Sequence, residues 1–212
     1  MVLDPKTKKR IVQRKLLHLG IGFIYLGLFS LQYLEDYVAP NFRFTREELL
    51  WSLMMFLVFF IFYEVIRLET KLPIPFRTLI KEKEAKSHVD GINLLVMAIL
   101  VTTFFQIEIA FVAVMIAVFG DAAASLGALY GRMKVFPNSL NKSTWEGIAL
   151  STVVNSIITV SAFGFGWQPF IIALVASFVE ALVVHIDDNI VVPLTTALTA
   201  YGLYSLQAYL VI

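Results

Sequence analysis

Long apolar stretches run through this chain of 212 residues and limit what it can fold into. A helix needs about 20 mostly apolar residues to cross the hydrocarbon core of a bilayer, which is about 30 Å thick. Hydrophobic residues make up 58% of the chain and charged residues 16%, against about 45–50% and about 25% in soluble domains. The sequence therefore predicts an all-α, polytopic integral membrane protein that forms a single domain over residues 1–212. Its seven candidate spans are 16–34, 48–66, 91–105, 109–130, 146–163, 169–186 and 189–212.

The apolar stretch 91–119 is too long for one ordinary span and carries Gln106 and Glu108 near its middle. A carboxylate in the middle of a bilayer is costly. We therefore expect a tight hairpin there, with one helix ending near Phe105 and the next starting near Ile109. The second helix is expected to continue to about residue 130.

The distribution of basic residues supports this division. With the N-terminus in the cytoplasm, the inside segments 1–16, 67–90 and 120–145 hold 15 of the 17 Lys and Arg residues. The other two, Arg43 and Arg46, lie in one outside loop. Because cytoplasmic loops of membrane proteins are enriched in Lys and Arg, we predict a cytoplasmic N-terminus.

The chain contains no Cys. This excludes a disulfide scaffold, thiolate-bound zinc, iron–sulfur clusters and thiol catalysis. Chemistry must therefore come from polar residues in apolar surroundings, each of which needs a partner in a medium without water. Four clusters of such residues fall at the predicted cytoplasmic face.

The first cluster is basic and lies at the start of the first span. Arg14 and His18 are four residues apart and share a helix face, and Lys15 lies beside Arg14. This group is suited to binding phosphates. The alternative is a basic membrane anchor with a histidine at the interface.

The second cluster is GDAAASLGALYGR, which begins at residue 120 and contains Asp121, Gly127 and Gly131. Small residues allow the backbone to approach a ligand's phosphates. They equally allow two helices to pack closely. Both readings remain open from the sequence.

The third cluster is NKSTWEG, which ends at Gly147. Thr144 is placed to cap the next helix, with Glu146 in its first turn. Capping does not explain Lys142, because a positive charge is unfavourable at a helix N-terminus unless an anion binds there. A phosphate site accounts for both features.

The fourth cluster, EALVVHIDDNIVVPL, is acidic. Asp187 and Asp188 are adjacent and Asn189 follows them, while Glu180 is expected two helical turns before Asp187 on nearly the same face. Oxygen ligands of this kind suit Mg²⁺ held together with substrate phosphates. The alternative is a polar turn between two helices.

These four stretches together resemble the CTP-dependent lipid kinases, which include dolichol kinase, phytol kinase and CTP-using diacylglycerol kinase and are distantly similar to phosphatidate cytidylyltransferase. The matching stretches are RKLLHLGIGF, GDAAASLGALYGR, NKSTWEG and EALVVHIDDNIVVPL, in the family's order. Two features depart from the family pattern. The interval from Asp121 to Gly127 is one residue shorter, and Asn141 replaces a second Lys before Lys142.

The resemblance implies a CTP-binding region and an acidic site. The residues that match the CTP-binding region are Asp121, Gly127, Gly131, Lys142, Thr144, Glu146 and Gly147, and those that match the acidic site are Asp187, Asp188 and Asn189.

The leading hypothesis is a kinase that transfers the γ-phosphate of Mg-CTP to a long-chain isoprenoid alcohol (dolichol, polyprenol or a phytol-like lipid) at the cytoplasmic face, with no nucleic-acid partner. Asp121, Asp187 and Asp188 are expected to hold Mg²⁺, with Glu180 beside them. Phosphates are assigned to Lys142, Arg14 and Lys15, and the base to His18 or an aspartate. The alternatives are a cytidylyltransferase that forms a CDP-lipid and a small transporter.

The topology can be tested by labelling, because a chain without Cys gives each single-cysteine variant one reactive thiol. Lys83→Cys and Asn138→Cys should react with an impermeant maleimide only from the cytoplasmic side. Asn41→Cys should react only from outside. Reaction of the Asn138→Cys variant from outside would contradict the hairpin near Glu108.

Overall fold

The computed structural model describes residues 5–31, 44–70, 90–135, 143–183 and 186–210. These residues form seven helical segments and no β-strand, apart from a single bridge between Lys134 and Thr144. The expectation of an all-α fold is confirmed for this part of the chain. The helices are α1 (Pro5–Ser30), α3 (Arg46–Thr70), α4 (Asp90–Phe104), a joined segment of α5 (Ile107–Met115), η3 (Ile116–Gly120) and α6 (Asp121–Tyr130), then α7 (Trp145–Phe163), α8 (Trp167–Leu182) and α9 (Asp188–Leu210).

The hairpin in the long apolar stretch is present. Helix α4 ends at Phe104 and α5 begins at Ile107, with Gln106 in an extended conformation between them. Glu108 lies exposed in the first turn of α5, where a negative charge is favoured by the helix dipole. The Glu108 carboxylate, which we expected to avoid the centre of the bilayer, therefore lies at a helix end.

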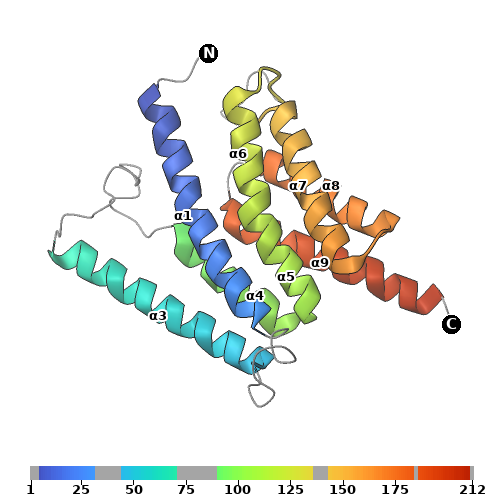
Figure 1. Cartoon of the computed structure of the whole chain (residues 1–212), viewed down its shortest axis with the longest axis horizontal. Coiled ribbons are helices and arrows are strands. Elements are labelled where there is room, and N and C mark those ends of the chain that lie inside the picture. Colours follow the sequence, from blue (N-terminus) through green and yellow to red (C-terminus); the bar gives the residue numbers. More distant parts are fainter. Residues whose placement is uncertain (1–4, 32–43, 71–89, 136–142, 184–185, 211–212) are drawn as a thin grey trace.

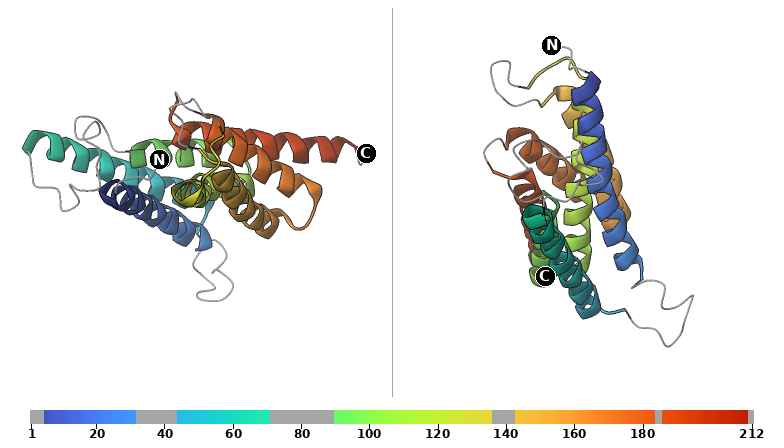
Figure 2. Two further views of the ribbon diagram at one scale, coloured as in Figure 1. Left: turned by 90° about the horizontal axis from the view of Figure 1, so that it is seen from above. Right: turned by 90° about the vertical axis from the view of Figure 1, so that its left-hand side faces the viewer.

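The segment α5–η3–α6 is the centre of the bundle (Figure 1). It contacts α1, α4, α7 and α9, while α8 packs against both α7 and α9. The side chains of Ile109, Val112, Val114 and Val118 along it are almost completely buried. Figure 2 shows α3 at the edge of the bundle, where its neighbours are α1 and α4.

Two helices within the described residues, Ile107–Tyr130 and Trp145–Phe163, are long and apolar enough to cross a membrane by length and composition. A topology with seven membrane spans requires more such helices than these two. The positions chosen for labelling, Asn41, Lys83 and Asn138, lie outside the described residues.

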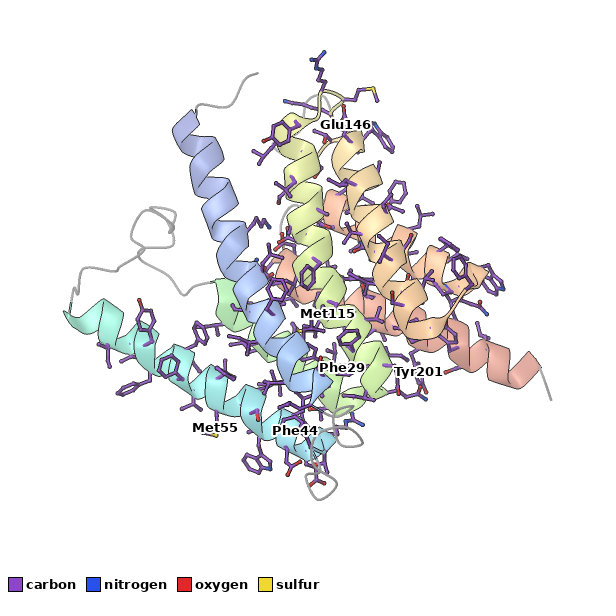
Figure 3. All side chains as sticks on the ribbon, viewed as in Figure 1. Phe29, Phe44, Met55, Met115, Glu146 and Tyr201 are labelled. Atoms are coloured by element: carbon purple, nitrogen blue, oxygen red, sulfur yellow. The ribbon has the colours of Figure 1, made fainter. Side chains whose placement is uncertain are left out.

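Helix α3 exposes a wide apolar face. Figure 3 shows Met55 pointing away from the bundle. Contiguous exposed apolar surface on this scale is unusual for a monomer in water and indicates contact with a membrane or another protein. Six large side chains of α3 are more than half exposed, namely Trp51, Met55, Val58, Phe59, Phe62 and Val65.

Arg46, a basic residue of the predicted outside loop, caps the C-terminus of α4. Its guanidinium donates hydrogen bonds to the carbonyl oxygens of Thr102 (2.7 Å from Nε), Thr103 (2.7 Å) and Phe105 (2.9 Å). The last carbonyls of a helix lack partners within the helix and attract positive charge. Arg46 therefore has a local structural reason to lie outside the basic segments.

Replacing Arg46 tests this cap. Arg46→Ala should lower the free energy of unfolding by about 1–3 kcal/mol, because three carbonyl oxygens lose a charged donor. Arg46→Lys should recover only part of the loss, since an ammonium does not reproduce the fork of the guanidinium. Glu47→Ala, on the same exposed turn, is the matched control and should melt like the wild type. The measurement is thermal unfolding in detergent, and an unchanged melting temperature for Arg46→Ala would contradict the cap.

Candidate functional site

A buried ion pair joins α1 to α6. The Lys15 ammonium donates to Oδ2 of Asp121 across 106 residues of sequence. Lys15 is 8% exposed and Asp121 is 6% exposed. Because an isolated charge is very costly to bury, each of these side chains depends on the other. Both residues were predicted to belong to the site, Lys15 as a ligand of phosphate.

The local helix structure places Asp121 beside Lys15. Asp121 is the first residue of α6 and directly follows the π-helical turn η3. Single π-helical turns are rare and occur frequently at functional sites. On α1, Lys15 and His18 are one turn apart and so lie on one face of the helix.

His18 is buried beside this pair without a hydrogen bond. Its side chain is 4% exposed, and its Nδ1 lies 3.6 Å from Oδ2 of Asp121, beyond hydrogen-bond distance. Neither ring nitrogen has a hydrogen-bond partner among the described residues. Buried polar groups in native proteins are nearly always paired, and the group nearest to this imidazole is the Asp121 carboxylate, with which it interacts electrostatically.

The turn between α8 and α9 is held by amide groups. Asp187 accepts hydrogen bonds from the side-chain amides of Asn93, on α4, and Asn189, the latter at 2.9 Å. Its Oδ1 also accepts from the backbone N–H of Asn189 at 3.0 Å. Asn189 is 3% exposed. Asn93 was not predicted as a site residue, although a polar side chain in the first turn of an otherwise apolar helix was its available signal.

The carboxylates of Asp121, Glu180 and Asp188 interact electrostatically with Lys15, and Asp187 interacts with Asp188; we call these four residues the acidic cluster. Glu180 interacts electrostatically with Asp121, Lys15 and Asp188, and Asp188 with Asp121, Lys15 and Asp187. Helix α8 ends at Leu182, so the expectation that Glu180 and Asp187 share a helix face is wrong. Tertiary packing, rather than one continuous helix, brings Glu180 to this group.

The two adjacent aspartates differ in their affinity for protons. Burial and the negative charge of Asp121 raise the pKa of Asp188 to about 6. Burial also acts to raise the pKa of Asp187, but hydrogen bonds from Asn93 and Asn189 outweigh it, so that this pKa is lowered. Asp187 is thus held as an ionised acceptor, whereas Asp188 exchanges its proton near neutral pH.

The glycines and caps of the second and third motifs form a separate group, the α6–α7 junction. A Cβ added to Gly127 would lie 2.6 Å from the Cα of Gly147, so the two helices approach at backbone contact. Thr144 Oγ1 accepts from the backbone N–H of Gly147 at 3.1 Å and caps α7. The contacts that the structure shows for these motifs are those of helix packing and helix capping.

Glu146 lies at the outer end of this junction (Figure 3). Its carboxylate accepts from the backbone N–H groups of Arg132 (2.8 Å) and Met133 (3.2 Å). A Cβ added to Gly131 would lie 2.5 Å from Thr144 Oγ1 and 2.8 Å from Glu146 Oε2. Backbone donors of this kind also bind phosphate oxygens. Lys142 lies outside the described residues, as does the side chain of Arg14.

The acidic cluster suits the expected Mg²⁺ in its donor atoms but not in their arrangement. Its carboxylate oxygens are the hard donors that Mg²⁺ prefers. Within the described residues, however, no three His, Asp or Glu side chains are arranged to hold a metal ion. The ammonium of Lys15 binds Asp121 where a cation would otherwise be needed. Binding of Mg²⁺ by Asp121, Asp188 and Glu180 therefore requires Lys15 to release Asp121.

Comparison with protein-family models, with curated protein sequences and with solved structures finds no match to this chain. The resemblance to CTP-dependent lipid kinases therefore rests on the four sequence motifs.

The raised pKa of Asp188 predicts how stability depends on pH. The folded state binds a proton more tightly than the unfolded state, so the protonated form stabilises the fold at low pH. This contribution is lost as pH rises from about 4 through about 6. Asp188→Asn should therefore raise the free energy of unfolding by about 1–3 kcal/mol at pH 8 without added metal, and have little effect at pH 4.

The matched control is Glu108→Gln, which removes an exposed carboxylate from the first turn of α5. Its effect on the melting temperature should be small at both pH values. Equal effects of Asp188→Asn at pH 4 and pH 8 would contradict the burial of an uncompensated charge at this position.

Proposed function

We propose that this protein is a membrane-embedded, CTP-dependent kinase that phosphorylates the hydroxyl of a long-chain prenol at the cytoplasmic face. The observation that supports it most is the convergence of Lys15, His18, Asp121, Glu180 and Asp188 from α1, α6, α8 and α9. Phosphoryl transfer needs little covalent chemistry from the protein and depends on positioning and charge neutralisation. The buried Asp121 and two half-buried carboxylates, beside a lysine and a histidine, are suited to that task.

The membrane part of the proposal is a seven-span topology with a cytoplasmic N-terminus. Two helices of sufficient length and the exposed apolar face of α3 support it. Asp121 follows Glu108 by thirteen residues, which is about 20 Å along a helix. If Glu108 marks the outer surface of a hydrocarbon core of about 30 Å, Asp121 lies about 10 Å inside the cytoplasmic boundary. The reaction would then take place below the membrane surface.

The proposal assigns metal binding and phosphate binding to separate groups of residues. Asp121, Asp188 and Glu180 are the proposed metal ligands, with Asp187 and Asn189 shaping the turn beside them. The bound Mg²⁺ would neutralise charge on the nucleotide phosphates. Lys15, once released from Asp121, would bind phosphate oxygens together with Arg14 and Lys142.

The nucleotide is proposed to lie along α6. The acidic cluster is at the N-terminal end of this helix and the α6–α7 junction is ten residues further on, about 15 Å away. The γ-phosphate belongs at the acidic cluster, where the acceptor must meet it. The remainder of CTP would extend toward Gly131, Thr144, Glu146 and Gly147.

Two alternatives use the same residues. A cytidylyltransferase would let a lipid phosphate attack the α-phosphate, releasing pyrophosphate and forming a CDP-lipid. A transporter would use the carboxylates as ion sites.

The product distinguishes the three. Purified protein with CTP labelled at the γ-phosphate and an isoprenoid alcohol should give a labelled lipid phosphate and CDP in the presence of Mg²⁺. Asp121→Asn and Asp188→Asn should each lower turnover by about 10²–10³-fold, because charge that stabilises the transition state is lost. Glu108→Gln should retain wild-type turnover.

Other outcomes would contradict the proposal. Pyrophosphate with a CDP-lipid would indicate the cytidylyltransferase. No transfer from CTP or ATP to dolichol, geranylgeraniol, phytol or diacylglycerol would exclude the kinase. Full activity of both aspartate variants at low Mg²⁺ would remove the acidic cluster from the mechanism.

A further inference from the structure

The Lys15 ammonium interacts with all three carboxylates that are proposed to bind Mg²⁺. It donates a hydrogen bond to Oδ2 of Asp121. It also interacts electrostatically with Glu180 and Asp188. A positively charged side chain of this protein therefore already neutralises the oxygens on which metal binding depends.

Free Mg²⁺ gains little by displacing this ammonium. Lys15 is 8% exposed and Asp121 is 6% exposed, so the ion pair lies in the interior. A buried charge that loses its partner destabilises a protein strongly. If Mg²⁺ took the three carboxylates as ligands, the Lys15 ammonium would stay inside the bundle, beside a second cation and without an anion of its own. Binding of the metal alone is therefore opposed by the cost of that unpaired ammonium.

A phosphate group beside the cluster changes this balance. Lysine ammonium groups bind phosphate oxygens well. The lysine side chain is also a flexible four-carbon stem, so the Lys15 ammonium can move from Asp121 to a neighbouring phosphate without a shift of α1. Lys15 then exchanges one anionic partner for another, and Asp121 becomes free to bind the metal. The phosphate thus removes the cost that opposes binding of Mg²⁺ alone.

We propose that Lys15 is an internal cation that prevents free Mg²⁺ from binding to the acidic cluster and makes the metal and a phosphate-bearing ligand bind cooperatively. This inference rests on the proposed function and adds how its site is regulated. The ion pair between Lys15 and Asp121 is then an autoinhibitory contact that the ligand's phosphate releases. Because linkage is reciprocal, the metal strengthens phosphate binding by the same factor by which phosphate strengthens metal binding.

Thermal unfolding of the purified protein in detergent tests this inference without any reaction. The wild type is melted with Mg²⁺ alone, with inorganic tripolyphosphate alone and with both together. Only the combination should raise the melting temperature, by several degrees more than the sum of the two separate effects. Tripolyphosphate supplies phosphate oxygens without a nucleoside, so this result does not depend on CTP.

Variants of Lys15 test the role of the ammonium itself. Lys15→Met keeps an unbranched side chain but removes the charge. It should melt below the wild type without metal, because Asp121 loses its cation, and Mg²⁺ alone should recover most of that loss. Lys15→Gln retains an N–H donor for Asp121 and should gain the same response to Mg²⁺, so it serves where Lys15→Met does not fold. The matched control is Lys134→Met, which removes an exposed lysine and should respond to Mg²⁺ as the wild type does.

Three results would overturn the inference. The first is stabilisation of the wild type by Mg²⁺ alone to the same extent as the Lys15 variants. The second is a folded Lys15 variant that Mg²⁺ does not stabilise. The third is a wild type for which Mg²⁺ and tripolyphosphate together do no more than the sum of their separate effects. Failure of the proposed kinase looks different, because all the expected melting results would then be obtained while no phosphate passes from CTP to an alcohol.

Discussion

The buried ion pair between Lys15 and Asp121 is the constraint around which the rest of the structure is arranged. It fixes the register of α1 against α6, because neither charge has an inexpensive alternative inside the bundle. Once the two helices are in this register, His18 and Ile21 follow on the same face of α1. The ion pair and the apolar core beside it are thus formed by consecutive turns of one helix.

The central helix carries a second constraint at the same level. A Cβ added to Gly120, the last residue of η3, would collide with Oδ1 of Asn155 on α7. Asn155 in turn donates to Ser177 Oγ on α8 at 2.9 Å. Close approach of η3 to α7 at this point therefore depends on the small residue that precedes Asp121.

Local features of the fold could be predicted from the sequence, whereas contacts created by the packing of distant helices could not. The break before Ile107 follows from apolar run length and the cost of placing Glu108 in a bilayer, whereas α1 begins at Pro5, eleven residues before the predicted span. The sequence indicated Thr144 as a helix cap and the glycines as contact points between helices. It could not distinguish these roles from phosphate binding. The partnership of Asn93 with Asp187, and that of Glu180 with Asp121, joins helices far apart in the sequence, so no spacing rule reveals them.

The charge balance of the cluster links its structure to its chemistry. Three carboxylates, those of Asp121, Glu180 and Asp188, interact with the single ammonium of Lys15, which pairs directly with Asp121. Hydrogen bonds stabilise Asp187 as an anion, but Asp188 shares its surroundings with Asp121 and Glu180. Such an excess of buried negative charge is relieved either by protons or by a cation. A divalent ion would relieve it most completely and would also free Lys15 for a phosphate. Under the proposed function, the charge imbalance that destabilises the cluster on its own would be relieved when a metal–nucleotide pair binds.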